Sequence, residues 1–283
     1  MKSMRKGSNN LVSLNVDGVT LSNDPSIVES MNDFFSSVFT SEDCDNFLEF
    51  EYVTNCKLSN ILCNTKEVEK MLKNFNIYES PGPDSLPPRI LKECASVLSS
   101  LLCFFFSKSF STGKLPHLWK LANITPLFKK GSKTDKNNYR QISLTSIVCK
   151  IAEKIVKSRV MDFWRNINIL NPNQFAYMEG RSTLSELLSC YDDWAKSRNN
   201  RKPTDIAFLD FSKAFDSVPH ERLLFKLERH GIDGSALQWF RNFLTGRMQR
   251  FVLRGTCSSW SPVLSGVPQG TILGPVLFIL KRE

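Results

Sequence analysis

The apolar periodicity of residues 145–163 constrains the fold of this chain more than any other feature. Apolar side chains recur there at helical spacing: Ile147, Val148, Ile151, Ala152, Ile155, Val156 and Val160. This spacing predicts an amphipathic helix with a wide apolar face. Such a face is stable only when a second layer of structure covers it. With 283 residues and 41% hydrophobic content, the chain is large enough to supply that layer.

The rest of the chain mixes helical and extended patterns. Helices are expected after Asp24-Pro25, over 66–75 with Thr65 as cap, over 88–112, from a capping box at 183–186, and over 219–230 and 235–244. Extended segments are expected over 121–130, over 205–210 and in a hairpin over 249–264. Pro126 argues against a central position for the first of these strands. This mixture predicts an α+β fold.

Several classes of protein are disfavoured by composition. No two of the eight cysteines form a Cys-x-x-Cys pair, and the three histidines lie apart from them, which argues against a zinc site. Residues 1–10 are basic and polar, unlike a secretory signal, so the cysteines are expected to be reduced. The apolar stretch 98–106 is too short to span a bilayer and is expected to form a buried helix.

Two short segments carry residues suited to chemistry. Asp210 ends the apolar stretch 205–210, and Asp216 follows six residues later. A carboxylate in such a place is either a helix-capping or ion-paired residue, or a ligand for Mg²⁺, which prefers oxygen donors. The second segment, 266–270, places two glycines around a Pro-Gln pair, so its backbone can turn sharply and approach a ligand closely. The alternative is that 266–270 is a loop after the hairpin without a ligand.

The positive charge of the chain is concentrated in one segment. The net charge is +9, and residues 120–159 hold ten basic residues against two acidic ones, a net charge of +8. Phosphate groups attract such clusters. A solvated helix face explains Lys150, Lys154 and Lys157, but it explains Lys129 and Arg140 less well, because these two flank a loop.

Six motifs follow one another in the order of a known family: SPGPD (80–84), WKLANITPLFKKGSK (119–133), NYRQISLTS (138–146), NQFAYMEGRST (173–183), AFLDFSKAFDSVPH (207–220) and SGVPQGTILGPVLF (265–278). Together they resemble the reverse transcriptase of a non-LTR, jockey-type or CR1-type, retrotransposon. The resemblance implies the fingers and a partial palm of a right-hand polymerase, an antiparallel sheet with packed helices, without a thumb. It divides the chain into an extension (1–64), a fingers-rich part (65–200) and a partial palm (201–283).

The resemblance also implies roles around the metal and the sugar. Asp210 matches the catalytic, metal-binding aspartate of the first palm motif, and the backbone carbonyl of Phe211 would be a second ligand to the same Mg²⁺. Phe215 matches the residue that packs under the incoming sugar, although it also fits a core aromatic residue. Gln269 and Gly270 match the loop that lies against the incoming nucleotide.

Basic residues receive the remaining roles by resemblance. Arg140 and a lysine of the pair Lys129–Lys130 match residues that bind the triphosphate. Arg181 matches a template or primer contact and fits a capping or salt-bridge role equally well. The implied partners are an RNA template, a DNA primer and dNTPs, with no membrane and an oligomeric state left open. Such partners imply an intracellular protein, in the nucleus or the cytoplasm.

The sequence departs from this family in three places. The aromatic-x-Asp-Asp motif that supplies a further metal carboxylate does not occur, Gln141 replaces the proline usual after NYR, and Tyr177–Glu179 departs from a basic consensus. These departures predict a polypeptide that is inactive as a polymerase. Two alternatives remain: a non-catalytic RNA-binding or DNA-binding remnant of a mobile element, and a chain that does not fold stably.

Overall fold

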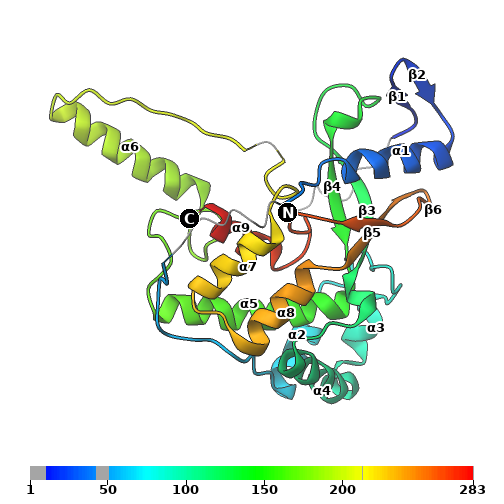
Figure 1. Cartoon of the computed structure of the whole chain (residues 1–283), viewed down its shortest axis with the longest axis horizontal. Helices are drawn as coiled ribbons and strands as arrows, with labels where there is room; N and C mark the ends of the chain where they lie inside the picture. The colour runs from blue at the N-terminus through cyan, green and yellow to red at the C-terminus, as the bar shows by residue number, and fades with distance from the viewer. Residues whose placement is uncertain (1–10, 43–50, 212, 283) are drawn as a thin grey trace.

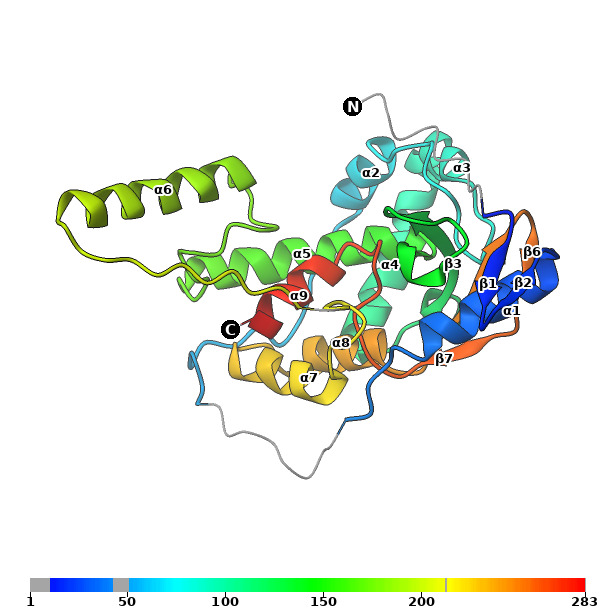
Figure 2. The same ribbon diagram turned by 90° about the horizontal axis from the view of Figure 1, so that it is seen from above.

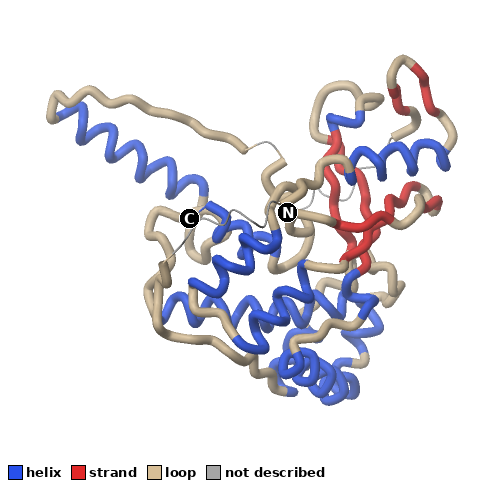
Figure 3. The backbone as a smooth tube through the Cα atoms, in the orientation of Figure 1, coloured by secondary structure: helices blue, strands red, loops and turns tan. Residues whose placement is uncertain are grey.

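The computed structural model describes residues 11–42, 51–211 and 213–282. Most of its helices gather on one side of the molecule and its strands on the other, but helix α1 (Asp24–Ser36) lies beside the strands (Figures 1 and 3). Two hydrophobic clusters hold the described residues together, a large one among the helices and a small one between helix α1 and the sheet. Helices and strands thus occur in separate runs along the chain and, apart from α1, in mostly separate regions, as expected for the α+β class.

The central sheet contains strands from distant parts of the chain. Its strands are β3 (Leu121–Phe128), β4 (Tyr139–Leu144), β5 (Arg247–Leu253), β6 (Thr256–Cys257) and β7 (Ser261–Val263). The order is β4-β3-β5-β6, with β7 also paired to β5. β3 and β4 are antiparallel, as are β5 and its partners β6 and β7, but β3 and β5 run parallel. The expectation of an antiparallel sheet is therefore wrong at this pair, because β3 and β5 are joined by a long helical crossover, which permits parallel pairing.

Strand β3 changes its environment along its length. Residues 121–124 pair with β5 on one side, whereas 123–128 pair with β4 on the other. The expectation that Pro126 argues against a central strand is therefore wrong, because β3 lies between β4 and β5. Pro126 lies beyond the part paired with β5, so its missing N–H costs no ladder hydrogen bond on that side.

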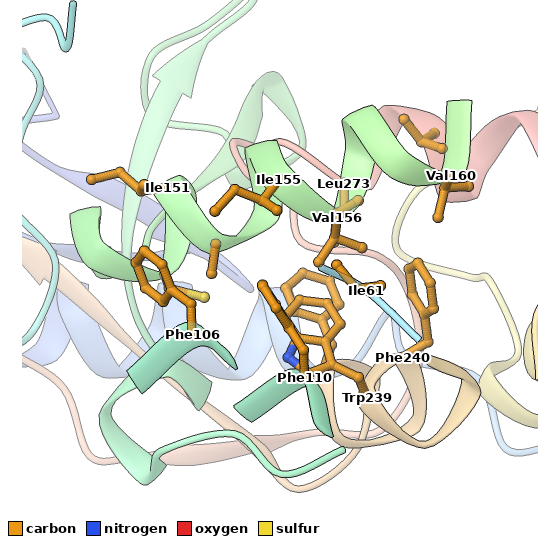
Figure 4. Close-up of a cluster of buried hydrophobic side chains, with 14 of the residues drawn as sticks. Ile61, Phe106, Phe110, Ile151, Ile155, Val156, Val160, Trp239, Phe240 and Leu273 are labelled. Atoms are coloured by element: carbon orange, nitrogen blue, oxygen red, sulfur yellow. The ribbon is translucent and has the colours of Figure 1, made fainter. Parts of the chain in front are cut away.

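A helical layer packs below the sheet. Its helices are α2 (Thr65–Lys73), α3 (Pro88–Glu93), α4 (Ala95–Thr112), α5 (Ile147–Asn166), α7 (His220–Arg229), α8 (Gly234–Leu244) and α9 (Gly274–Arg282). Figure 4 shows the apolar face of α5 directed at aromatic side chains of α4 and α8. The rings of Phe110 and Trp239 meet edge to face, with centroids 5.8 Å apart. The long apolar face predicted from the sequence thus lies at the centre of the main core.

Helix α4 differs from the expectation of a buried helix. One face is buried through Ala95, Ser99, Leu102, Phe106, Ser109 and Phe110. The opposite face exposes Val97, Leu101, Phe104 and Phe105. By length and composition alone α4 would be able to cross a membrane. Its packing against α2 and α8 is that of a core helix with one uncovered face.

The N-terminal elements cover the other part of the sheet. Strands β1 (Leu14–Val16) and β2 (Val19–Leu21) form a hairpin, and helix α1 (Asp24–Ser36) packs on β5. Asn23, rather than Asp24, caps α1 by accepting a hydrogen bond from the backbone N–H of Ser26 at 2.8 Å. The Asp24 carboxylate instead pairs with Arg254. The same one-residue displacement occurs at α2, where Asn64 is the cap instead of Thr65.

Helix α6 (Thr183–Asn199) and the segment after it extend away from the rest of the molecule (Figures 1 and 2). The capping box forms at Ser182 and Ser185, one residue before the predicted position. None of the residues of α6 is buried. The apolar side of this helix, Leu184, Leu187, Leu188 and Tyr191, is therefore exposed.

The strand predicted over 205–210 is absent from the structure. Residues 202–211 form no helix or strand, and Phe208 and Leu209 are each 86% exposed. An apolar stretch becomes a strand only when a neighbouring strand accepts its backbone hydrogen bonds. No described strand lies beside this segment. The prediction of a buried strand that ends in Asp210 is therefore wrong for this structure.

Candidate functional site

One large cavity brings together most of the predicted site residues. It has a volume of about 750 Å³ and is bordered by α1, β4, the segment 210–216, the loop 268–270 and α9. Seven predicted residues line it: Lys129, Arg140, Asp210, Phe211, Phe215, Gln269 and Gly270. Lys130 and Arg181 do not belong to its lining. Its lining contains charged, polar and apolar side chains, which suits an amphipathic ligand.

The loop 265–270 is fixed between two neighbouring segments. The backbone N–H of Ser143 donates to the carbonyl of Gln269 at 2.7 Å, which joins the loop to β4. The N–H of Val267 donates to the carbonyl of Phe215 at 2.8 Å, which joins it to the segment before α7. Gly270 has a φ of +111°, and a Cβ there would lie 2.8 Å from the Ser143 oxygen. Glycine is thus required both for the turn and for the close approach.

Helix α9 receives a cap from a different helix. The Glu153 side chain of α5 is fully buried, and its Oε2 accepts hydrogen bonds from the N–H groups of Ile272 at 2.7 Å and Leu273 at 3.0 Å. Burial raises the pKa of this carboxyl above its usual range, although the two backbone hydrogen bonds oppose the shift. Glu153 therefore holds the end of the loop that carries Gln269 and Gly270.

Asp216 is held by two glutamine side chains. The Nε2 groups of Gln141 and Gln269 each donate to its Oδ1 at 2.8 Å. Burial raises the pKa of Asp216, and the two amide hydrogen bonds lower it less strongly. Neither of the two simple alternatives, a helix cap or an ion pair, describes this carboxylate. It is instead the acceptor at the centre of a side-chain network that connects β4 with the loop.

Asp210 lies in the cavity lining but on the exposed segment that follows residue 201. Among residues 11–42, 51–211 and 213–282, no group of three Asp, Glu, His or Cys side chains is arranged to hold a metal ion. Asp216 is the other carboxylate of the lining. The oxygens available to a cation are thus few, and they suit an ion that brings further oxygen ligands with its substrate.

Phe215 combines aromatic packing with a place in the cavity lining, so it fits a core aromatic residue, whereas its packing under a sugar stays a prediction. Its ring stacks on Phe278 of α9, with centroids 4.3 Å apart and planes at 15°, and it meets Tyr177 edge to face at 6.3 Å. It is also part of the cavity lining. The Phe215 ring therefore forms part of the cavity wall, and its stacking on Phe278 limits its movement.

Only part of the basic segment 120–159 faces solvent. Lys150 is 7% exposed and pairs with Glu79 at 2.9 Å. Arg159 pairs with Glu67, and the Lys154 ammonium lies 4.5 Å from the centre of the Phe75 ring. The prediction that Lys150 belongs to a solvated helix face is thus wrong. The positive charge available to a ligand comes mainly from the β3–β4 connection. Its exposed cations are Lys129, Lys130, Lys133 and Arg140.

Arg181 stabilises its own loop. Its guanidinium donates to the carbonyls of Pro172 and Gln174, the latter at 3.0 Å, and lies 4.9 Å from the centre of the Phe175 ring. These contacts lie within its own loop and are neither a helix cap nor an ion pair, and the contact with template or primer stays a prediction. Lys213, by contrast, lines the cavity and was not singled out from the sequence, although it lies between Asp210 and Asp216. Gln141 was recognised as a departure from the family but not as a partner of Asp216.

Comparison with known proteins identifies the family of this chain. Residues 128–281, more than half of the chain, match the family described as reverse transcriptase (RNA-dependent DNA polymerase). The RNA-directed DNA polymerase from mobile element jockey of Drosophila melanogaster is 28% identical over 235 residues, which are 83% of this chain and 25% of that protein. The probable RNA-directed DNA polymerase from transposon BS of the same species is 26% identical over 75% of this chain and 24% of its own length.

The chain spans about a quarter of the length of these relatives. The matched region includes β4, the segment 210–216 and the loop 265–270, and so contains every predicted site residue. The chain belongs to the reverse transcriptase (RNA-dependent DNA polymerase) family, among the non-LTR retrotransposon members represented by jockey.

Proposed function

We propose that this chain forms the nucleotide-binding part of an RNA-directed DNA polymerase. The reaction would transfer a nucleotide from a dNTP to the 3′-hydroxyl of a DNA primer on an RNA template. The observation that supports this most strongly is the convergence of seven predicted residues on one cavity. They come from parts of the sequence as distant as Lys129 and Gly270, so their meeting in one place depends on the fold.

The side chains of the cavity suit the parts of a nucleotide. Lys129 and Arg140 are cations that would neutralise a triphosphate and the charge that develops on its leaving group. Phe215 offers an apolar ring to the sugar, and its bracing by Phe278 fixes that surface. Gln269 and Gly270 lie on a loop whose backbone is held on both sides, so they would form a rigid wall beside the nucleotide.

The oxygens of Asp210 and of the Phe211 carbonyl would hold Mg²⁺ together with oxygens of the triphosphate. Mg²⁺ commonly binds through one or two carboxylates, substrate phosphates and water, so this small set of protein ligands fits an ion that arrives with its nucleotide. The bound ion would polarise the reacting phosphate. The contribution of Asp210 itself would be one carboxylate in a cavity lining that also contains the cations Lys129 and Lys213.

As a separate polypeptide, the chain is proposed to bind nucleotide without efficient polymerisation. The described residues offer one exposed carboxylate to the cavity, on a segment without strand pairing. A two-metal mechanism requires more carboxylate than this. In the same proposal, residues 65–200 are the fingers-rich part of the domain and 201–283 a partial palm.

Primer extension and nucleotide binding test the two parts of this proposal separately. Purified protein is given an RNA template, a DNA primer and dNTPs with Mg²⁺, and dNTP affinity is measured by calorimetry. We expect measurable binding that Lys129→Glu and Arg140→Glu weaken about tenfold each, with Lys108→Glu on α4 as the control. Mg²⁺-dependent extension that Asp210→Asn abolishes would refute the inactivity, and absence of dNTP binding would refute the proposed function.

A second candidate, a non-catalytic nucleic-acid-binding module, is supported by the exposed cations of the β3–β4 connection. Lys129, Lys130 and Lys133 are exposed, and none of them forms an ion pair within the described residues. Such a patch would bind a phosphate backbone with an affinity that falls steeply with salt. RNA affinity is measured between 50 and 200 mM salt, with and without added dNTP. The second candidate predicts RNA binding that dNTP does not compete with.

A further inference from the structure

Gln141 departs from the family sequence, and the proposed function leaves it unexplained. Its side chain is 6% exposed on β4, where the related motif carries a proline. Its Nε2 donates to Asp216 Oδ1 at 2.8 Å, across a separation of 75 residues. A proline has no group able to make this hydrogen bond, so the network around Asp216 contains a donor that the usual residue would not supply.

The chemistry of Asp216 determines how the two amides are oriented. An ionised carboxylate only accepts hydrogen bonds, so a carboxamide beside it must present its NH₂ group and not its oxygen. Gln269 donates its Nε2 to the same Oδ1 at 2.8 Å. The orientation of the Gln269 carboxamide is therefore set by Asp216, and with the nitrogen engaged there, the side chain offers its Oε1 to a ligand.

The backbone around this pair is also fixed. Ser265 Oγ donates to the carbonyl of Asp216 at 2.8 Å, and Ser143 N–H donates to the carbonyl of Gln269 at 2.7 Å. A Cβ at Gly266 would lie 2.7 Å from the Asp216 carbonyl oxygen, which shows how closely the two segments approach. Main chain and side chain thus hold Gln269 from different directions, as a preorganised recognition group requires.

We propose that Asp216 and Gln141 are positioning residues that fix the Gln269 carboxamide as a hydrogen-bond acceptor for the nucleoside part of the ligand. Lys129 and Arg140 supply the affinity for its phosphates. This proposal rests on the proposed function, because it takes the cavity to be a nucleotide site. It separates two contributions to binding: the cations recognise any polyphosphate, whereas the three-residue network recognises what the polyphosphate is attached to.

The positioning itself is tested without any ligand. The side-chain ¹⁵N–¹H signals of Gln269 are assigned by their loss in Gln269→Leu, and their hydrogen exchange is measured. We expect exchange to accelerate about tenfold in Asp216→Asn, the factor that one ordinary hydrogen bond supports, and two- to threefold in Gln141→Leu. Gln249→Leu, which replaces a buried glutamine of β5 that is not bonded to Asp216, is the matched control. Unchanged exchange in both network variants would overturn the proposal.

The nucleoside selectivity is tested with dATP and inorganic tripolyphosphate. Gln141→Leu changes no charge, so it is the cleanest variant, and we expect about a threefold weaker affinity for dATP with unchanged affinity for tripolyphosphate. Equal weakening of both ligands would overturn the proposed role. If the unaltered protein binds neither ligand, the nucleotide site itself is refuted and with it the selectivity, whereas the exchange measurement still decides whether Asp216 positions Gln269.

Discussion

The connection between α5 and α9 through Glu153 allows a quantitative prediction. The carboxylate is buried in α5, and its Oε2 accepts the N–H groups of Ile272 and Leu273 immediately before α9. These two groups belong to the helix start, where backbone donors have no partner within the helix. The Cys149 thiol donates to Oε1 at 3.7 Å. Replacing Glu153 by alanine removes the acceptor, whereas replacing it by glutamine keeps an oxygen of the same shape.

The expected loss follows from the two donors. A buried donor left without a partner costs about 1–3 kcal/mol, so Glu153→Ala should lower the free energy of unfolding by about 2–6 kcal/mol. Part of this loss is offset, because the variant no longer buries a carboxylate whose pKa is raised by its surroundings. In Glu153→Gln one oxygen accepts both backbone hydrogen bonds and the new NH₂ group faces the Cys149 sulfur. We expect this variant to stay within about 1 kcal/mol of the unaltered protein.

Urea unfolding at pH 7, followed by circular dichroism and tryptophan fluorescence, measures the difference between the two variants. An alanine variant as stable as the glutamine variant would refute the capping role of Glu153. The pH dependence gives an independent check. Because the folded protein raises the pKa of Glu153, it binds this proton more tightly than the unfolded chain does. The contribution of Glu153 to stability must therefore fall as pH rises from the usual carboxyl range through the raised pKa, and Glu153→Gln must lack this decrease.

Three further results are expected. Phe106→Ala in the main core should cost about 3–5 kcal/mol in urea unfolding, whereas Phe104→Ala, on the exposed face of the same helix, should stay within about 0.5 kcal/mol; similar losses would contradict the core assignment. Burial lowers the pKa of His220, so stability should decline as pH falls below about 6.5, where the unfolded chain takes up the proton first, and a flat thermal-stability profile would contradict this. Gly270→Ala should weaken dNTP binding, measured by calorimetry, more than Gly255→Ala does. Both glycines have a positive φ, but of the two only Gly270 lacks room for a Cβ. Equal effects would show that the close approach at Gly270 is unimportant.

Helices were the part of the fold that the sequence predicted best, because their signals are local. The helix predicted over 145–163 is present as Ile147–Asn166, and the predicted end of α4 at Gly113 is confirmed by a φ of +65° there. Caps were displaced by one residue at α2 and α6, since neighbouring Asn, Ser and Thr side chains all qualify and the backbone angle decides among them.

Sheet structure was harder to predict, because a strand depends on residues far away in sequence. The pattern of 205–210 is that of a buried strand, yet without a described neighbour the segment stays unpaired and exposed. The parallel pairing of β3 with β5 likewise joins Leu121 to Met248. No local pattern contains information on such a partner.

The site shows the same division between local and distant information. Motifs predicted seven of the residues that line the cavity, but not the pairing of Gln141 with Asp216 or the capping of α9 by Glu153. The net charge of 120–159 also overestimates the positive charge at the surface, because Lys150 is buried and forms an ion pair with Glu79. Charge counts describe a segment, whereas the available charge depends on partners that only the fold brings together.

The proposed nucleotide binding and the catalysis of the family would depend on two parts of this chain that the fold holds with different firmness. The wall of the cavity that would bind a nucleotide is made from β4 and the loop 265–270, which are joined by backbone hydrogen bonds and capped through Glu153. Asp210 lies on an exposed segment that no described strand supports. A rigid wall preserves binding even when the opposite segment moves, whereas transfer of a phosphoryl group requires the carboxylate in a fixed place. Substitutions in the first region should therefore alter affinity, and a partner strand that orders residues 205–210 should alter only the chemistry.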